Sequence, residues 1–252
     1  MKLFGIFADY DGTLAPKNVT RIESKPLEGI EESIDTIKKY GKFVVISTKD
    51  YWFLASRLSN VDAFGCIGGI EVVIGDRAWI RKDITQKLRV IGKLLDVLIQ
   101  MTIDSDIVFE IKALRNKKVA GLCIDWRYGR VPAKQFMERI KESARRLGLY
   151  VEGCEYEPFL DIFPIRPDKG VAASFIKEAL GINGPIMYIG DGKMDNPAFR
   201  IADVSVGVIH EDNFPELECQ YFINFEDVPK LFSELAKHEL NFEPNNRLLC
   251  RV

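Results

Sequence analysis

Histidine is scarce in this sequence, and its cysteines are not paired. Only two histidines occur, His210 and His238, which leaves little room for a histidine metal cluster, and we expect both to be structural or surface residues. No Cys-x-x-Cys pair is present, so neither a zinc site nor a disulfide framework is indicated. This usage favours a reducing, cytoplasmic setting. The five cysteines are Cys66, Cys123, Cys154, Cys219 and Cys250.

The chain also lacks an excess of positive charge and a long hydrophobic run. Its formal net charge is −2, so a nucleic-acid partner is not expected. No apolar stretch approaches the roughly 20 residues of a membrane-spanning helix, and a strand directly after Met1 leaves no room for a signal peptide. With 252 residues, 47% of them hydrophobic, the chain can form one large domain or two modest ones.

Apolar, β-rich segments alternate with amphipathic segments along the chain, which predicts an α/β fold with a parallel sheet. The middle of the chain has a different order of helix, strand, strand, helix, strand, strand. We therefore predict a core formed by residues 1–82 and 164–252, and an inserted α/β domain at 83–163. Core strands are expected at 3–7, 42–46, 64–67, 186–189 and 204–209, a hairpin at 71–80, and helices at 28–40, 51–58 and 171–180. The insert is expected to have helices at 83–101 and 132–147 and strands at 107–112, 119–127, 149–154 and 159–163.

Two carboxylates follow the first expected strand. Asp9 and Asp11 stand two residues apart at its end, before Gly12, which permits a sharp turn. Such a pair is costly unless a cation or a proton separates their roles. Asp9 can serve as a nucleophile and metal ligand, and Asp11 as a general acid and base. The alternative is an ordinary turn, because Asp-Gly is a common turn pair.

Two further segments carry groups suited to a phosphate. Ser47 follows the strand at 42–46, where its hydroxyl could hold a phosphate oxygen or simply cap a helix. Thr48 is an alternative to it. Lys169 precedes the helix at 171–180 and could be the fixed cation that a phosphate dianion needs beside carboxylates. A solvated lysine is the alternative.

The fourth segment again places glycines and acids after an apolar strand. Gly190, Asp191, Gly192 and Asp195 follow the strand at 186–189, and carboxylate oxygens suit Mg²⁺. A dinucleotide fingerprint would require glycine at position 195. No Gly-x-x-x-x-Gly-Lys-Ser/Thr loop occurs either, which disfavours a P-loop nucleotide enzyme.

Together these segments resemble the haloacid dehalogenase (HAD) superfamily. Asp9, Asp11, Gly12 and Thr13 match its first motif, Asp-x-Asp-Gly-Thr, and the other three segments follow in family order. The resemblance implies a Rossmann-like core with a cap domain and a Mg²⁺-dependent phosphatase that works through a phospho-aspartate.

The resemblance also implies a role for each matching residue. Asp9 would be the nucleophile, and Ser47 and Lys169 would bind the phosphate oxygens. Mg²⁺ would bind to Asp9, to Asp11 through its backbone carbonyl, and to Asp191. For Asp195 two roles remain open, either a metal ligand or the carboxylate that orients Lys169.

The expected insert has features that resemble the cap of trehalose-6-phosphate phosphatases, which carry Glu-x-Lys and then His-Tyr-Arg. Glu110, Lys112 and Arg127 match, whereas Asp125 and Trp126 replace the His and Tyr. The three matching residues are therefore candidate substrate-binding residues, with trehalose 6-phosphate as the first expected substrate. The alternative is a solvated sheet face with paired charges.

Other functions stay open at this point. The segment 47–49 also resembles mannosyl-3-phosphoglycerate phosphatases, and a phosphomutase would return the phosphoryl group to a sugar. A non-catalytic sugar-phosphate binding protein is an alternative from another class. A receiver-like phospho-acceptor is disfavoured, because it has no need of an acid at Asp11. The expected partner is a small-molecule sugar phosphate, with no membrane involved.

Overall fold

The computed structural model describes residues 1–101, 107–127, 129–130, 134–153, 158–210 and 216–251. The chain divides into two compact units. The first consists of Met1–Lys49, Phe53–Trp79 and Asp168–Val252, and the second of Asp50–Trp52 and Ile80–Pro167.

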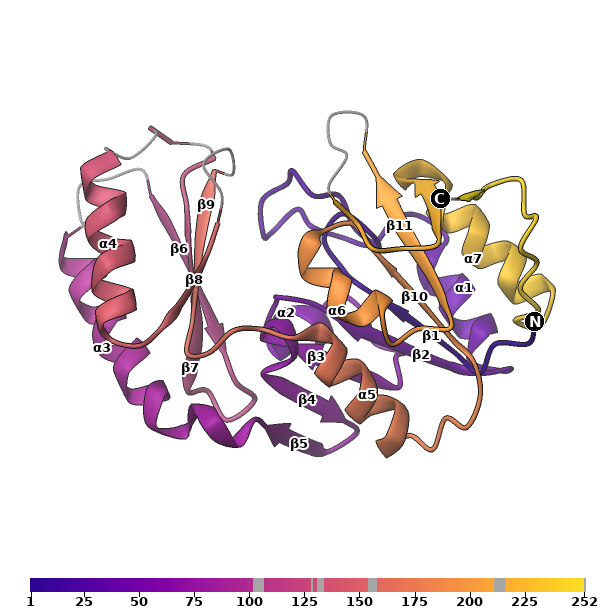
Figure 1. Cartoon of the computed structure of the whole chain (residues 1–252), viewed down its shortest axis with the longest axis horizontal. Coiled ribbons are helices and arrows are strands. Elements are labelled where there is room, and N and C mark those ends of the chain that lie inside the picture. The colour runs from indigo at the N-terminus through magenta and orange to yellow at the C-terminus, as the bar shows by residue number, and fades with distance from the viewer. Residues whose placement is uncertain (102–106, 128, 131–133, 154–157, 211–215, 252) are drawn as a thin grey trace. The chain divides into compact units, whose positions relative to one another are not determined.

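A nine-stranded sheet forms the first unit, with the strand order β13-β12-β11-β10-β1-β2-β3-β4-β5 (Figure 1). The six strands from β12 to β3 in this order run parallel, and β4 and β13 are antiparallel to their neighbours. The strands are β1 (Gly5–Ala8), β2 (Lys42–Ile46), β3 (Ala63–Cys66), β4 (Glu71–Ile74), β5 (Arg77–Ile80), β10 (Ile186–Gly190), β11 (Val204–Ile209), β12 (Tyr221–Asn224) and β13 (Cys250–Arg251).

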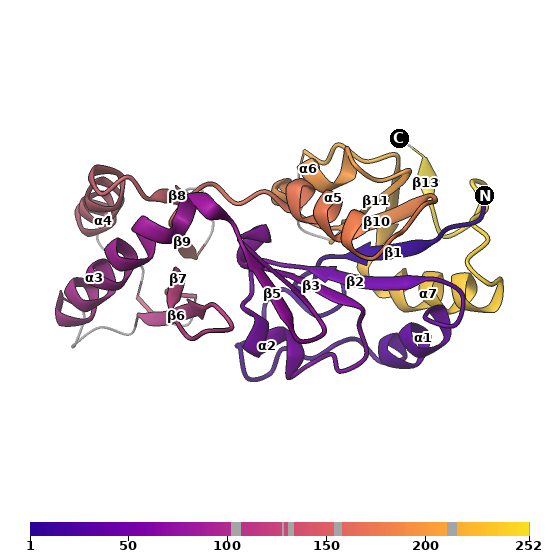
Figure 2. The same cartoon turned by 90° about the horizontal axis from the view of Figure 1, so that it is seen from below.

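Helices cover both faces of this sheet. Figure 2 shows α5 (Lys169–Ala179) and α6 (Asn196–Phe199) on one face and α1 (Ile30–Ile37) and α7 (Val228–Lys237) on the other. The short helix α2 (Tyr51–Ala55) is divided between the two units. Every residue of β1 and β10 is buried, which explains why these strands read as continuous apolar runs in the sequence.

The second unit is a four-stranded antiparallel sheet with the order β6-β7-β9-β8. Its elements are α3 (Thr85–Met101), β6 (Val108–Ala113), β7 (Val119–Asp125), α4 (Lys134–Arg146), β8 (Tyr150–Glu152) and β9 (Phe159–Phe163). Helices α3 and α4 lie on one face of this sheet (Figure 1). Leu122, Ile124, Leu160 and Ile162 pack against them in one apolar cluster. Because strand side chains alternate, residues at the intervening positions lie on the opposite face.

The predicted fold class is confirmed: a mostly parallel α/β core is accompanied by a separate sheet with two helices. The predicted insert at 83–163 lies inside the second unit. That unit consists of Ile80–Pro167 together with the short segment Asp50–Trp52. Positions 132 and 133 of the expected helix at 132–147, and position 154 of the expected strand at 149–154, lie outside the described residues. Strands β12 and β13 were not predicted from the sequence. His210 directly follows β11, which is not the last strand of the core.

The cysteines of the described part of the chain, Cys66, Cys123, Cys219 and Cys250, are free thiols. Among the described residues, no helix is both long enough and apolar enough to cross a membrane.

Candidate active site

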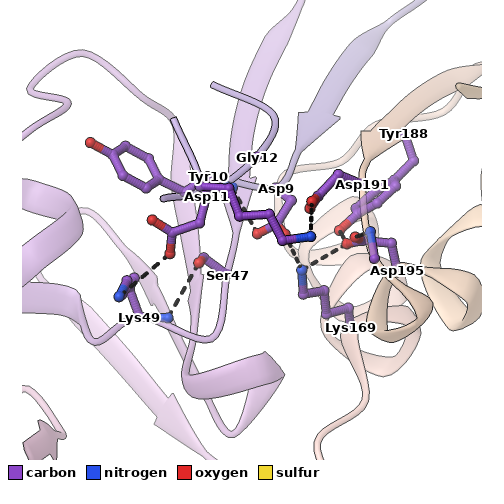
Figure 3. A network of polar contacts seen from close by, with 12 residues as sticks. Asp9, Tyr10, Asp11, Gly12, Ser47, Lys49, Lys169, Tyr188, Asp191 and Asp195 are labelled. Atoms are coloured by element: carbon purple, nitrogen blue, oxygen red, sulfur yellow. Dashed lines mark hydrogen bonds and ion pairs between the residues drawn. The ribbon is translucent and has the colours of Figure 1, made fainter. Parts of the chain in front are cut away.

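Three neighbouring parallel strands end at the same edge of the large sheet. Ala8 of β1 is in register with Ile189 of β10 on one side and with Val45 of β2 on the other. Adjacent strands lie about 4.8 Å apart, so the residues that follow them are brought together. In this way Asp9, Ser47 and Asp191 meet, although they come from distant parts of the sequence (Figure 3).

The turn after β1 sends its two carboxylates to different surroundings. The backbone N–H of Asp9 donates to the carbonyl of Ile189 at 2.9 Å, so the sheet pairing extends to Asp9. The N–H of Tyr10 donates to Oδ1 of Asp9 at 2.7 Å and fixes that carboxylate. Asp11 is more exposed, and its Oδ2 lies 3.5 Å from Nζ of Lys49.

Three buried carboxylates form a cluster around one lysine. Asp9, Asp191 and Asp195 each offer an oxygen, and these atoms all lie within 4.8 Å of one another. Lys169 Nζ lies 2.8 Å from Oδ2 of Asp9 and 2.7 Å from Oδ1 of Asp195. The side chain of Lys169 is buried as well. The ammonium group of Lys169 therefore lies between Asp9 of the first motif and Asp195 of the fourth.

Asp195 accepts three hydrogen bonds. Besides Lys169, the hydroxyl of Tyr188 donates to its Oδ1 at 2.6 Å, and the N–H of Gly192 donates to its Oδ2 at 2.9 Å. Burial, followed by the charge of Asp195, raises the pKa of Tyr188 well above its usual value, so the phenol stays a donor. These contacts favour the role of orienting Lys169 over that of a metal ligand.

The pKa values of three side chains in this cluster are shifted by burial and by their charged neighbours. Burial raises the pKa of Asp9 to about 8, and Asp195 and Asp191 add to this while Lys169 opposes it. Burial raises the pKa of Asp191 too, against the effect of Lys17. Burial lowers the pKa of Lys169, but Asp195 and Asp9 outweigh it, so the amine stays charged.

This donor set fits a divalent cation. Mg²⁺ prefers oxygen ligands and is commonly bound by one or two carboxylates. Asp9 and Asp191 supply such oxygens, and a second positive group would offset the burial and the carboxylate repulsion that raise both of their pKa values.

Glycines make room for two of these carboxylates. Gly12 has φ of 75°, and a Cβ atom there would lie 2.2 Å from Oδ2 of Asp191. A Cβ atom at Gly190 would lie 2.4 Å from Cγ of Asp195. Gly12 is thus favoured both by its turn and by the close packing of Asp191, and Gly190 by the close packing of Asp195.

Ser47, at the end of β2, is almost fully buried. Its Oγ accepts a hydrogen bond from the N–H of Lys49 at 3.2 Å. Its hydroxyl hydrogen can therefore still be directed to a phosphate oxygen. Thr48, the alternative from the sequence, is only half-buried.

Two residues that the sequence patterns did not single out also contact Asp191. Lys17 Nζ lies 2.9 Å from its Oδ2. His210 Nε2 lies 3.7 Å from the same oxygen and 2.9 Å from the carbonyl oxygen of Gly12. A carbonyl can only accept, so Nε2 of His210 carries the hydrogen. The ring also lies against Phe225, with centroids 4.9 Å apart.

The second unit places Glu110 and Lys112 on the sheet face opposite α3 and α4. Lys112 is only 2% exposed, and its Nζ lies 2.6 Å from Oδ1 of Asp161. Gly121 stands opposite Lys112 on β7, and its lack of a side chain leaves room for Lys112 to reach across to β9. Arg127 Nε lies 2.9 Å from Oδ2 of Asp125, so Arg127, like Lys112, forms an ion pair within the second unit.

Comparison with known proteins identifies the fold. No family model matches the chain. It is similar in structure to a trehalose-6-phosphate phosphatase related protein, with a TM-score of 0.75 and 18% identity over 93% of this chain and 97% of the other. The C-terminal domain of trehalose-6-phosphate phosphatase from C. albicans gives a TM-score of 0.71 and 14% identity over 94% and 93% of the two chains. The chain has the fold of the HAD superfamily phosphatases.

Two further proteins are similar to this chain, one in structure and one in sequence. A phosphatase of the haloalkanoate (HAD) enzyme superfamily from Bacteroides thetaiotaomicron covers 94% of this chain and 95% of its own, at a TM-score of 0.60 and 15% identity. By sequence, phosphoglycolate phosphatase 2 of Saccharolobus solfataricus is 24% identical over 212 residues, or 81% of this chain and 78% of that protein.

The four motifs predicted from the sequence thus converge at one end of a HAD-type core. Strand alternation could have indicated Tyr188, which lies two residues before Gly190 and has a polar tip. His210 could have been suspected from its place at the end of a strand that neighbours β10. No sequence pattern marks Lys17.

Proposed function

We propose that this protein is a magnesium-dependent phosphatase that hydrolyses a phosphate monoester through an aspartyl phosphate on Asp9. The observation that carries the proposal is the contact of the buried Asp9 carboxylate with Lys169 at 2.8 Å, beside Asp191 and with Asp11 two residues away. A nucleophile, an acid and a cation are thereby present at one sheet edge.

Asp9 acts as the nucleophile. One of its oxygens attacks phosphorus, the new O–P bond forms, and the bond to the leaving oxygen breaks. Water then attacks the phosphorus of the aspartyl phosphate and releases inorganic phosphate. The N–H of Tyr10 and the ammonium of Lys169 hold the carboxylate before the reaction, which lowers the entropic cost of attack.

Asp11 transfers the protons. It donates a proton to the departing oxygen in the first step and removes one from the attacking water in the second. Its greater exposure than Asp9 suits a group that must meet both the leaving group and water.

Lys169 and Ser47 bind the non-transferred phosphate oxygens and stabilise the charge that spreads over them. Asp9, the backbone carbonyl of Asp11 and Asp191 would hold Mg²⁺. When bound, this ion supplies positive charge that neutralises the phosphate and orients it toward Asp9.

The proposed substrate is a sugar phosphate, with trehalose 6-phosphate first. Glu110, Lys112 and Arg127 support it, because they bring charged groups to one small sheet of the second unit. The likeness in fold to proteins described as trehalose-6-phosphate phosphatases also supports it. Phosphoglycolate and mannosyl-3-phosphoglycerate are the other candidates, the former because of the relative from S. solfataricus.

A phosphate-release assay tests the proposal. Trehalose 6-phosphate, mannosyl-3-phosphoglycerate, phosphoglycolate and p-nitrophenyl phosphate are each supplied with Mg²⁺, with EDTA, and with the Asp9→Asn variant. We expect release that requires Mg²⁺ and is lost in Asp9→Asn, because an amide cannot form the acyl phosphate. Full activity in EDTA with metal shown absent, or wild-type-like release by Asp9→Asn, contradicts the mechanism. A requirement for a sugar bisphosphate activator would indicate a phosphomutase, and binding without turnover a sugar-phosphate binding protein.

A further inference from the structure

Lys17 makes an ion pair with the carboxylate that is proposed to hold Mg²⁺. Its Nζ lies 2.9 Å from Oδ2 of Asp191. The lysine side chain is 35% exposed, whereas that of Asp191 is only 6% exposed. Lys17 has no role in the chemistry proposed above, so this contact needs a separate explanation.

The rest of the surroundings hold Asp191 in place. Gly12 packs so closely against Oδ2 of Asp191 that a Cβ atom there would overlap it. His210, fixed by its 2.9 Å hydrogen bond to the carbonyl of Gly12, approaches the same oxygen at 3.7 Å. Of these three residues, Lys17 has the longest and most flexible side chain, which is 35% exposed against 23% for that of His210.

The contact has an electrostatic consequence. Asp191 is a buried carboxylate with Lys17 Nζ at 2.9 Å, and a buried charge is costly unless a partner of opposite charge lies close to it. An ammonium so close to the ligand oxygen also repels a divalent cation strongly, because the repulsion between charges a few ångströms apart is large near a protein surface. Both cations therefore cannot be bound to Asp191 without a loss of free energy.

We propose that Lys17 is an internal counter-ion that competes with the divalent cation for Asp191. Lys17 pairs with the carboxylate and holds it in position in the metal-free protein, and it moves toward solvent when the divalent ion binds. Its charge thereby weakens the affinity of the site for the metal. This inference rests on the proposed magnesium site, but it concerns a residue outside the four motifs.

Direct binding of Mn²⁺, followed by electron paramagnetic resonance of the free ion, tests the inference without any turnover. Lys17→Met replaces the unbranched four-carbon stem by one of nearly the same length and removes the charge, and Lys17→Arg keeps the charge. Lys193→Met is the matched control, since Lys193 stands two residues from Asp191 but is 66% exposed and pairs with Glu216 at 3.1 Å. We expect Lys17→Met to bind Mn²⁺ about tenfold more tightly at low salt. Lys17→Arg and Lys193→Met should remain near the wild type.

Thermal unfolding provides a second measurement. In EDTA, Lys17→Met should unfold at a lower temperature than the wild type, because Asp191 loses its counter-ion. With saturating Mg²⁺ the difference should vanish, because the metal then supplies that charge. A purely structural lysine would lower the unfolding temperature equally in both conditions.

Each outcome of the binding experiment decides a separate point. Unchanged or weaker Mn²⁺ binding by a folded Lys17→Met overturns the competition, and weaker binding would make Lys17 a positioning group for Asp191. Equal tightening by Lys193→Met would reduce the effect to general charge and overturn it too. If the wild type binds no Mn²⁺ or Mg²⁺, the proposed metal site fails and this inference fails with it. If the protein has phosphatase activity but Lys17→Met binds Mn²⁺ as the wild type does, the proposed function is supported and the competition by Lys17 is overturned.

Discussion

Gly12 and Asp191 are in direct contact, although they belong to opposite ends of the sequence. A Cβ atom on Gly12 would lie 2.2 Å from Oδ2 of Asp191, well inside any allowed separation. The turn that presents Asp9 and Asp11 therefore packs against the carboxylate that follows β10. Gly12 therefore permits the turn of the first motif and also leaves room for Asp191 of the fourth motif.

Replacement of Gly12 by alanine should separate this contact from the strain of the turn. Gly12 has φ of 75° and Gly29 has φ of 81°, but nothing lies within 4 Å of a Cβ atom built on Gly29. Gly29→Ala should cost only the left-handed strain, about 1–2 kcal/mol. Gly12→Ala should cost at least about 1 kcal/mol more, because the new methyl must displace a buried carboxylate.

Urea unfolding measures the loss of stability in Gly12→Ala and Gly29→Ala, and Mn²⁺ binding measures the effect of each substitution on the metal site. Gly12→Ala should also weaken Mn²⁺ binding, whereas Gly29→Ala should not. If both variants lose the same stability and keep the same metal affinity, the packing of Gly12 against Asp191 has no energetic weight.

Because the pKa of Asp9 is raised in the folded protein, we expect the free energy of unfolding to depend on pH. In the folded protein this pKa is about 8, against an ordinary value of 3.8, and burial is the main cause. The folded state therefore keeps a proton that the unfolded state releases between these values. A rise in pH through this window favours unfolding, and the stability is highest below it.

Comparison with Asp9→Asn isolates this group. In EDTA, the stability of the wild type relative to Asp9→Asn should fall from pH 5 to pH 8, by at most about 1.4 kcal/mol per pH unit. Mg²⁺ should flatten the slope for the wild type, because it replaces the proton as the balancing charge. A difference in the free energy of unfolding that stays constant with pH would show that the Asp9 pKa is not raised.

Asp11 should affect the chemical steps and leave the metal site intact. Asp11→Asn removes a proton donor and acceptor, while its backbone carbonyl remains. Loss of general acid–base catalysis typically costs about 10²–10⁴-fold in rate. The loss should be smaller with p-nitrophenyl phosphate, whose leaving group needs little protonation. Steady-state kinetics on both substrates test this, and equal losses with unchanged Mn²⁺ affinity would assign the leaving-group acid elsewhere.

Three of the candidate site residues could be brought together from the sequence, because each follows the end of an apolar strand. Asp9, Ser47 and Asp191 follow three runs that are buried on both faces, and such runs are visible in a sequence. Lys17 was not predictable, because the segment between Ala15 and Ile30 has no periodic pattern and its path depends on the tertiary structure. Strand alternation gave the face of Lys112 but not its burial, which depends on Asp161.

The buried pair of Lys112 and Asp161 changes how Lys112 can be tested. Lys112→Met would leave the carboxylate of Asp161 buried without its partner, which typically costs about 3–5 kcal/mol. The double variant Lys112→Met/Asp161→Leu removes both charges and should recover most of that loss. Chemical unfolding measures this. If Lys112→Met alone is as stable as the wild type, the pair contributes little and Lys112 can be replaced singly.

The sugar-specificity hypothesis is best tested first at Glu110 and Arg127. A site that holds a hydroxyl with charged groups discriminates strongly against substrates that lack it, because its own groups are left unpaired. Glu110→Ala and Arg127→Ala should therefore lower kcat/KM for the sugar phosphate and barely change it for p-nitrophenyl phosphate. Lys141→Ala is a suitable control, because Lys141 forms an i,i+3 ion pair with Glu138 on α4 at 3.1 Å.

Lys112 is then tested in the double variant with Asp161, where folding is no longer the main effect. If Lys112 binds the sugar, the stable double variant should still lose kcat/KM for the sugar phosphate and keep its activity on p-nitrophenyl phosphate. Recovery of both activities would make the pair a structural element of the sheet. Equal losses on the two substrates at Glu110 and Arg127, or none on either, would leave this face as an ordinary solvated sheet surface, and substrate selection would have to come from other residues.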